Sequence, residues 1–327
     1  MESLIEFLNK LTEKGVKFFV EGGRLSFEST DNFISQEVKN EIISREAEII
    51  SLANEFPLSG EETRLYNLQK TFAHLGAFNV PICVKLANDF RIDVLNNAWE
   101  HLLVQHRILK SRIVEKRGAL WRRVSDECKT SIDIQNINFL DDQDRLTFLQ
   151  EESKQNFDLN VGPLVKAKMY SQDGRDSVLL ITINNIIFDE ASSVVLLKSL
   201  FGLYKQLLSG ENIVVRSELF PGQSFNVKAP AEQQSERSDS VAAYWRQQLG
   251  GELPGFELLP DVPRLVTASF NGETLVENLP VELAQKVIDF SKSKDVSPST
   301  IFLVTLQLLL HKYTHQEEVI VGVSASS

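Results

Sequence analysis

The sequence predicts an α/β (α+β) fold, in which a small unit with the element order αββαα precedes a larger mixed part. A two-glycine hairpin pattern near the N-terminus and the alternation of helical and strand patterns beyond Phe56 indicate this class. With 327 residues, 43% of them hydrophobic, the chain can bury one large core or two modest ones. We expect three parts, with boundaries at residues 1–55, 57–230 and 231–327.

Helical patterns open and close the first part. Apolar residues recur at helical spacing over 4–11, and Gly15 follows at the place of a left-handed C-terminal cap. Thr30 and Asp31 offer an N-cap for one or two further amphipathic helices, whose apolar positions run over residues 33–50.

Between these helices, the segment KFFVEGGRLSFES predicts a β-hairpin. Phe18 and Val20 alternate before the Gly22–Gly23 pair, and Leu25 and Phe27 alternate after it. A two-stranded sheet leaves unpaired backbone groups on its edges, and such an edge can accept a strand from a partner. The alternative is that the hairpin packs internally, as an ornament of the larger domain.

The larger part alternates between the two periodicities. The expected helices span 95–109, 145–155, 194–208 and 238–249, and the expected strands span 112–115, 164–169 and 178–183. A polar turn at 171–176 joins two of these strands. A linker rich in Gln, Ser, Pro and Ala is expected at 228–237.

Composition restricts the class of partner and the compartment. A formal net charge of −11 argues against nucleic acid or an anionic membrane as the main partner. Cys83 and Cys128 are far apart and show no metal-ligand spacing, which favours a reducing compartment. The most apolar run, 301–310, is too short to span a bilayer. We therefore expect a cytoplasmic protein.

The first part resembles the TubC-type docking domains found at the start of nonribosomal peptide synthetase subunits. The likeness is carried by residues 4–29, LIEFLNKLTEKGVKFFVEGGRLSFES, and extends over residues 1–55. It implies that this unit binds the C-terminal tail of an upstream synthetase subunit, partly by strand addition at the hairpin. The partner-binding residues that it implies are Lys17, Phe18, Phe19, Val20, Arg24, Leu25 and Phe27.

Five ordered motifs in the remainder resemble the condensation domains of the same synthetases. They are Ser59–Tyr66 (SGEETRLY), Gln105–Ile113 (QHRILKSRI), Phe157–Met169 (FDLNVGPLVKAKM), Tyr244–Leu249 (YWRQQL) and Ser299–Val323. The resemblance implies a chloramphenicol-acetyltransferase-like fold, with a first lobe at 57–230 and part of a second lobe at 231–327. In that part of the second lobe we expect a strand near 267–277, a helix at 281–292, another at about 299–313 and a strand at 318–323. It also implies antibiotic or other natural-product biosynthesis, without an intrinsic cofactor. The substrates would arrive on the phosphopantetheine arms of peptidyl carrier proteins.

The stretch INNIIFDEASS falls where this family carries its HHxxxDG signature. Asn184 and Asn185 stand in place of the two histidines, Asp189 is kept, and Glu190 replaces the glycine. In the family, the second histidine accepts a proton from the acceptor amine or positions that amine. The aspartate has a mainly structural role, pairing with an arginine of the second motif, where this chain has Lys110.

The residue types explain why the replacement matters. Imidazole titrates near neutral pH, so it can take and return a proton, whereas an amide side chain can only form hydrogen bonds. The sequence therefore favours a condensation domain without catalytic activity. Asn185 would be a degenerate catalytic position, with Asn184 and Glu190 beside it, Asp189 structural, and Lys110 and Arg64 of the motifs in support. His74, His101, His106, His311 and His315 do not fall in the signature stretch.

The resemblance also implies that motifs expected after VIVGV are missing, so that the substrate tunnel is incomplete. The chain is then a piece of a larger synthetase or a naturally truncated pseudo-domain, and the changed histidines favour the second. Apolar surface left exposed by the missing half-lobe favours a homo-oligomer.

Two catalytic alternatives stay open. The first is an active condensation enzyme in which Asn185 positions the amine to form a peptide bond. The second is a free-standing CoA-dependent acyltransferase of the same fold. It meets the same objection, because its HxxxD motif also requires a histidine at position 185.

Overall fold

A computed structural model shows the chain as two compact units, residues 1–235 and 236–327. The structure describes residues 3–323 apart from 22, 30–33, 73–75, 88, 126, 129, 138, 140, 173–174, 220–236, 252, 254, 256–257, 259–260 and 264–274. The expected parts 1–55 and 57–230 both lie in the first unit. The linker expected at 228–237 falls almost wholly outside the described residues, so that boundary stays a prediction.

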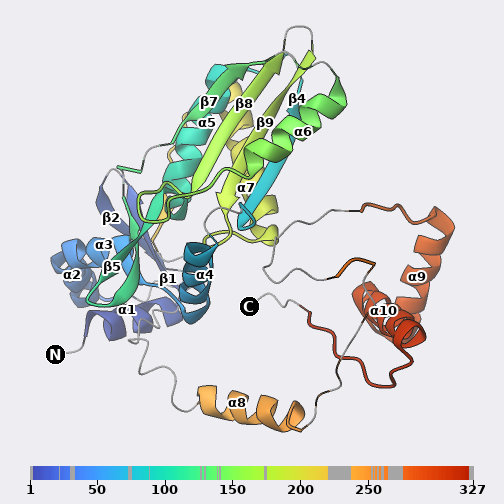
Figure 1. Cartoon of the computed structure of the whole chain (residues 1–327). Helices are drawn as coiled ribbons and strands as arrows, with labels where there is room; N and C mark the ends of the chain where they lie inside the picture. Colours follow the sequence, from blue (N-terminus) through green and yellow to red (C-terminus); the bar gives the residue numbers. More distant parts are fainter. Residues whose placement is uncertain are drawn as a thin grey trace. The chain divides into compact units, whose positions relative to one another are not determined.

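The N-terminal elements follow the expected order in Figure 1. They are α1 (Leu4–Glu13), β1 (Val16–Glu21), β2 (Arg24–Ser29), α2 (Gln36–Ser44) and α3 (Glu46–Asn54). Ser3 and Glu6 form a capping box at the start of α1, and Gly15 follows the helix at φ 78°.

The N-cap of α2 differs from the expectation. It is Ser35, whose side chain accepts a hydrogen bond from the Val38 N–H, whereas Thr30 and Asp31 lie outside the described residues. An N-cap side chain accepts from the N–H two or three residues later, so a helix that begins at Gln36 needs its cap at Ser35.

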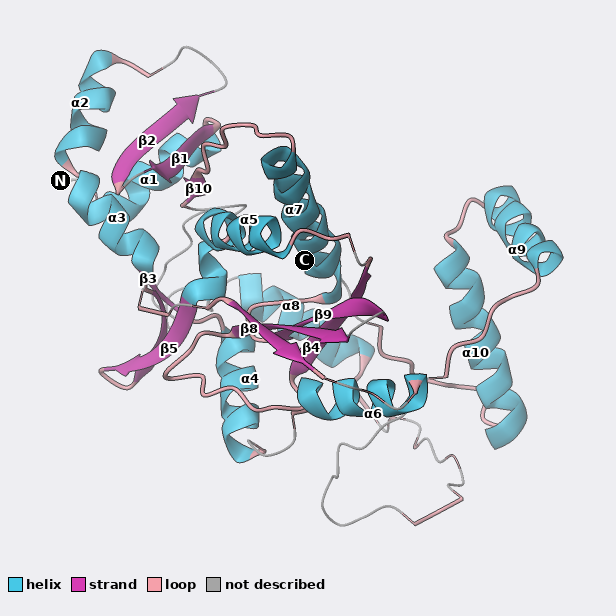
Figure 2. Cartoon of the chain, turned by 90° about the horizontal axis from the view of Figure 1, so that it is seen from above, coloured by secondary structure: helices cyan, strands magenta, loops and turns pink. Residues whose placement is uncertain are grey.

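A segment from much later in the chain completes the N-terminal sheet. β10 (Ser217–Glu218) pairs antiparallel with β1, so that the strand order is β10-β1-β2, as Figure 2 shows. Leu219, directly after β10, is 8% exposed and belongs to the same hydrophobic core as α1 and the hairpin. The buried members of this core are Phe7, Leu8, Leu11, Val16, Phe18, Ile42, Ile49, Ala53 and Leu219.

A second three-stranded sheet has the order β3-β6-β5. These strands are β3 (Glu55–Pro57), β6 (Ala119–Val124) and β5 (Ser111–Lys116), and the 3₁₀-helix Arg107–Lys110 leads into β5. Next to it is α4 (Gly60–Thr71). Ser59, the first residue of the first motif, caps this helix and forms a capping box with Glu62.

The central sheet has four strands in the order β4-β9-β8-β7. They are β4 (Asn79–Leu86), β9 (Arg175–Asn184), β8 (Val165–Gln172) and β7 (Ile132–Asn136), and only the β7–β8 pair is parallel. β8 and β9 fall where the sequence predicts strands, whereas β4 and β7 were not predicted, although Val80, Ile82, Val84 and Leu86 of β4 alternate and pack in one cluster.

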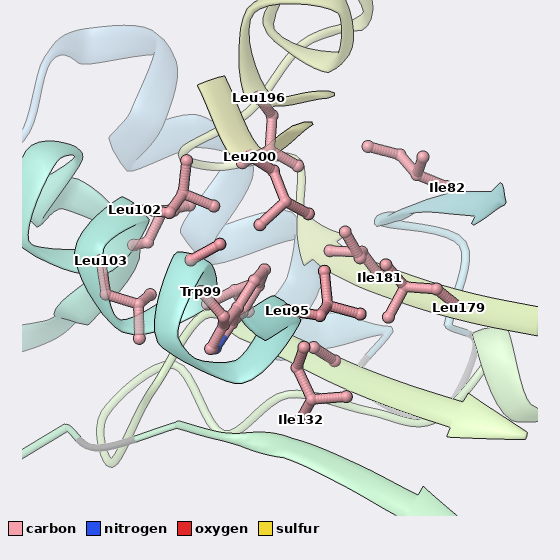
Figure 3. Packing of buried hydrophobic residues seen from close by; sticks show 14 of the residues in the cluster. Ile82, Leu95, Trp99, Leu102, Leu103, Ile132, Leu179, Ile181, Leu196 and Leu200 are labelled. Carbon is pink, nitrogen blue, oxygen red and sulfur yellow. The ribbon is translucent and has the colours of Figure 1, made fainter. Parts of the chain in front are cut away.

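Both faces of the central sheet are covered by helices. α5 (Ile92–Gln105) and α7 (Glu190–Leu208) pack on one face, where Trp99 and Ile181 are fully buried (Figure 3). α6 (Asp142–Ser153) covers the other face, because Leu149 shares a cluster with Leu180 and Tyr170. Neighbouring residues of β9 therefore enter opposite cores, as the period-2 alternation of a strand requires.

In the second unit the described residues form three helices, α8 (Arg237–Gln248), α9 (Val281–Lys294) and α10 (Pro298–Thr314). They agree with the expected helices. The strand expected at 318–323 is wrong, because these residues have no regular structure and no strand is described in this unit to pair with them. The strand expected near 267–277 falls mostly outside the described residues. Among the helices of the described chain, none has the length and apolar character needed to cross a membrane.

Candidate active site

The two asparagines of the signature stretch lie at the C-terminal end of β9, an inner strand of the central sheet. Asn184 is its last residue, pairs with Asn79 of β4 and is 2% exposed. The Asn184 N–H donates to the Leu164 carbonyl at 3.0 Å, and the Asn185 N–H donates to the Phe78 carbonyl at 2.9 Å. The backbone of neighbouring segments thus fixes both residues before the chain turns into α7.

Gln69 of α4 joins the two asparagines in a cluster of three amide side chains, the carboxamide cluster. Its Nε2 donates to Asn184 Oδ1 at 3.1 Å and to Asn185 Oδ1 at 3.0 Å. In return, Asn184 Nδ2 donates to Gln69 Oε1 at 2.9 Å. Gln69 is 6% exposed, so this reciprocal pair is buried and satisfies both amide groups.

The carboxamide cluster is neutral and does not titrate near neutral pH. Asn185 is half-buried, and its carbonyl oxygen is already engaged by Gln69. None of the hydrogen bonds of the described residues uses the Asn185 amide nitrogen, which leaves it as a donor for a ligand carbonyl. The cluster can orient polar groups of a ligand, but it cannot remove a proton from one.

A buried arginine holds the turn that follows the asparagines. The Arg122 side chain on β6 is 3% exposed, and it donates to the Ile186 carbonyl at 2.9 Å and to Glu62 Oε1 at 2.7 Å. Burial lowers the pKa of the Arg122 guanidinium, and the Glu62 carboxylate opposes that shift. Arg122 therefore connects the second sheet, the start of α4 and the signature stretch.

A cavity of about 470 Å³ lies beside Asn184. It is lined by Tyr66, Gln69, Lys70, Gly76, Phe78, Asn79, Asn156, Phe157, Asp158, Leu159, Asn160 and Asn184. Its lining is held in place by polar contacts. The Tyr66 hydroxyl donates to Asn160 Oδ1 at 2.9 Å, and Asn79 Nδ2 donates to the Ser153 and Gln155 carbonyls at 2.8 and 2.9 Å. The cavity thus unites residues of the first and third motifs.

Asp189 caps α7. Its carboxylate accepts hydrogen bonds from the Ser192 N–H at 2.8 Å and the Ser192 hydroxyl at 2.5 Å, and these bonds lower the pKa of Asp189. Lys110 ends the 3₁₀-helix before β5, and its charge acts on the Cys128 thiol. The expected pairing of Lys110 with Asp189 stays a prediction. Glu190 is the first residue of α7, and Arg64 lies exposed on α4.

The described histidines contact other parts of the chain. His106 Nε2 is 3.2 Å from the Ser199 hydroxyl of α7, and burial lowers the pKa of His106. His101 and His311 form hydrogen bonds with backbone carbonyls close in sequence. His74 lies outside the described residues. Within the described residues, no histidine forms a hydrogen bond with Asn184 or Asn185.

The residues expected to bind a partner divide between the two faces of the hairpin. Phe18 is 1% exposed, and Val20, Leu25 and Phe27 pack on the same core. Lys17, Phe19 and Arg24 alternate with them and lie on the opposite face. Lys17 is 3.7 Å from Glu218 of β10. Their role in partner binding stays a prediction.

Gln69, Arg122 and the strand β10 were not identified from the sequence. Gln69 lies one helical turn after Tyr66 of the first motif, which is the signal that could have placed it on the same face of α4. Arg122 gives no such signal, because an arginine in a strand is usually exposed. In the described part of the chain, no cluster of His, Cys, Asp and Glu side chains has the arrangement of a metal site.

Comparison with known families agrees with this geometry. Residues 53–327 match the Condensation domain family, and residues 4–55 match the TubC N-terminal docking domain family. The first match includes α4, β9 and the carboxamide cluster. The second ends where β3 begins.

Two curated bacterial proteins illustrate the similarity. Polyketide synthase PksN of Bacillus subtilis is 30% identical over 267 residues, which are 82% of this chain and 5% of that protein. Bacitracin synthase 2 of Bacillus licheniformis is 23% identical over 340 aligned positions, covering 98% of this chain and 13% of that protein. The chain therefore corresponds to a small fraction of each.

Two solved structures share the fold. The four-domain nonribosomal peptide synthetase holo-AB3403 matches 80% of this chain and 20% of its own, with a TM-score of 0.65 and 18% identity. The cyclization-docking bidomain of EpoB from Sorangium cellulosum matches 95% of this chain and 66% of its own, with a TM-score of 0.58 and 16% identity. The second match extends over both family regions, and at these identities it concerns the fold alone.

Proposed function

Because the chain belongs to the condensation-domain family of nonribosomal peptide synthetases and carries a TubC N-terminal docking domain at residues 4–55, we propose that it docks to a partner subunit and presents carrier-bound substrates. The docking domain receives the C-terminal tail of an upstream synthetase subunit. The condensation domain binds peptidyl carrier proteins and accepts their phosphopantetheine arms, but it does not join the substrates that they carry.

The carboxamide cluster is the observation that supports the lack of catalysis. General-base catalysis contributes about 10²- to 10⁴-fold in rate, and it needs a group that can accept a proton near working pH. Asn185 stands where the family has that group, and Gln69 already engages its oxygen at 3.0 Å. Binding and orientation can persist without the base, whereas proton transfer cannot.

Incubation with loaded donor and acceptor carrier proteins tests this proposal. We expect the chain to produce no amide above the level of Asn185→Ala, when the product is followed by mass spectrometry. The control is Asn97→Ala on α5, which leaves the signature stretch intact. Amide formation that Asn185→Ala abolishes and Asn97→Ala retains would sink the non-catalytic assignment.

A second candidate function is an active condensation enzyme in which Asn185 positions the amine. The observation in its favour is that Gln69 holds the Asn185 side chain at 3.0 Å, and the second lone pair of Asn185 Oδ1 can accept a hydrogen bond from the amine. This candidate predicts that Gln69→Ala reduces amide formation as strongly as Asn185→Ala, because both variants lose the same orientation.

Titration with the upstream subunit's C-terminal tail peptide tests the docking half of the proposal. The expected result is a perturbation of NMR signals in residues 17–28, the hairpin region. A tail peptide that leaves these signals unchanged at millimolar concentration contradicts docking at this hairpin.

A further inference from the structure

The β1 edge of the docking hairpin is already occupied by the chain's own β10. Phe19 pairs with Glu218 and Val20 pairs with Ser217, and the Leu219 N–H donates to the Phe18 carbonyl at 2.9 Å. In an antiparallel pair, alternate residues direct their backbone groups to the same neighbour. Phe18 and Val20 therefore direct theirs toward β10, in the place where an added strand would bind.

Side chains on both faces of the sheet secure this strand. On the inner face, Leu219 is 8% exposed within the docking core. On the outer face, the Arg216 guanidinium is 2.5 Å from Glu28 and 3.4 Å from Glu21, so one cation contacts both strands of the hairpin. Lys17 and Glu218 add a pair at 3.7 Å. A chance contact between a loop and a sheet edge would not combine backbone pairing, apolar burial and charge complementarity.

We propose that residues 216–219 act as a resident strand, which closes the β1 edge of the docking sheet and restricts an incoming partner strand to the β2 edge. The second half of this proposal rests on the docking function proposed above. The resident strand belongs to the segment that leads out of α7, so it also ties the docking domain to the condensation domain within the first unit.

The β2 edge is itself partly occupied. The Leu25 N–H donates to the Glu46 carboxylate of α3 at 2.7 Å. Because Leu25 directs its backbone away from β1, this contact covers the end of the β2 edge near the glycine turn. A partner strand that pairs with β2 would therefore form its first backbone hydrogen bonds at Phe27, the next residue that faces away from β1. An extended peptide segment is the ligand chemistry that fits such an edge.

A disulfide trap tests the resident strand in the whole chain. Phe19 and Glu218 lie directly opposite each other, so Phe19→Cys with Glu218→Cys should form a disulfide under mild oxidation, with exposed Cys83 replaced by serine. The control pair is Ser26→Cys with Glu218→Cys, because Ser26 lies two strands from Glu218, about 10 Å away, and should form none. Equal crosslinking of both pairs, or of neither, overturns the proposal.

Hydrogen exchange gives a second measurement that does not depend on the added cysteines. Arg216→Glu places a carboxylate beside Glu21 and Glu28, so exchange at Phe18 and Val20 should rise at least tenfold. Adding Glu28→Arg should restore most of the protection from exchange, because it re-forms an ion pair with the new glutamate. If Arg216→Glu simply unfolded the hairpin, the second substitution would not restore protection. Arg246→Glu on α8 is the matched charge reversal and should leave exchange unchanged. Unchanged exchange at Val20 in Arg216→Glu overturns the proposal.

Binding to the trapped chain tests the restriction to β2. The tail peptide of the upstream subunit should bind the crosslinked and reduced chains with affinities within twofold, because the crosslink leaves β2 untouched. Loss of binding on crosslinking means that the tail uses the β1 edge, and it overturns the restriction. A tail peptide that binds neither form contradicts the proposed docking function and, with it, the restriction to β2, while the disulfide result still decides the resident strand.

Discussion

At the scale of single residues, amide side chains order the signature stretch. Asn184 and Asn185 preserve hydrogen bonds at the end of β9, and Gln69 supplies the complementary amide. Asp189 keeps a local role, because it caps α7 through Ser192. The polar contacts that order the stretch therefore do not depend on a titratable group at position 185.

Gln69 should be important for stability as well as for the site. Gln69→Leu removes three hydrogen bonds and leaves the buried Asn184 amide unsatisfied, which costs about 1–3 kcal/mol. Thermal unfolding of the variant measures this loss. Gln143→Leu on the exposed side of α6 is the control, and it should change stability by less than about 0.5 kcal/mol. Equal stabilities of the two variants would contradict a buried, satisfied cluster.

Two neighbouring arginines of β6 offer a matched comparison. Arg122→Met breaks a pair whose arginine is 3% exposed and should cost about 3–5 kcal/mol, because Glu62 and the Ile186 carbonyl lose their partner. Arg123→Met removes a pair with Glu55 at 3.3 Å on a side chain that is 34% exposed, and it should cost at most about 1 kcal/mol. Chemical denaturation of both variants measures the difference. Similar losses would mean that Arg122 does not hold the signature stretch.

At the scale of elements, α6 is tied to the central sheet by an acid-sensitive contact. Glu152 accepts hydrogen bonds from Lys168 at 2.6 Å and from the Tyr170 hydroxyl at 2.8 Å. Burial alone would raise the pKa of Glu152, but these hydrogen bonds outweigh it and lower that pKa. The unfolded chain then binds the proton more tightly than the folded chain, and stability falls as the carboxylate is protonated.

The sign of this shift gives a pH-dependent prediction. The contribution of Glu152 is fully present above its unfolded pKa of about 4.3 and is lost as pH falls through the lower folded value. Glu152→Gln should therefore be less stable than the unmodified chain at pH 7, and the gap should narrow below about pH 4. Melting temperatures at both pH values measure it. Glu151→Gln, at a side chain 68% exposed, should show no such gap at either pH.

Elements could be predicted from the sequence where their own residues determine them. α1 carries periodic apolar positions and a capping box at its start, and the glycine pair marks the hairpin. β10 could not be predicted, because a two-residue strand is defined by a partner about 200 residues earlier in the chain rather than by its own pattern. The strand expected at 318–323 failed for the converse reason, since an apolar run forms a strand only where a second strand pairs with it, and residues 318–323 pair with no strand of the described residues.

The candidate site likewise contains residues that could be located from the sequence and residues that could not. Asn184, Asn185 and Asp189 could be located from their spacing alone, because they are contiguous in one stretch. Gln69 is 115 residues from Asn184, and Arg122 is 64 residues from Ile186. Such contacts depend on how α4 and β6 pack against β9, which periodicity within a segment does not specify.

At the scale of the whole molecule, the docking domain and residues 57–230 lie in one compact unit. Residues 1–55 and the resident strand share a core, and both lie in the unit that ends at Ser235. The expected division into three parts stays a prediction, and the match to the docking-domain family ends at residue 55.

All hydrophobic clusters of the described residues lie in the first unit, so we expect the cooperative unfolding transition to belong to that unit. Leu200→Ala truncates a side chain that is fully buried there and should cost that unit about 2–5 kcal/mol. Differential scanning calorimetry should show this transition shifted to lower temperature. Leu308→Ala on α10, where the side chain is 59% exposed, should not shift it appreciably. Equal shifts in the two variants would mean that residues 236–327 unfold together with the first unit as one cooperative body.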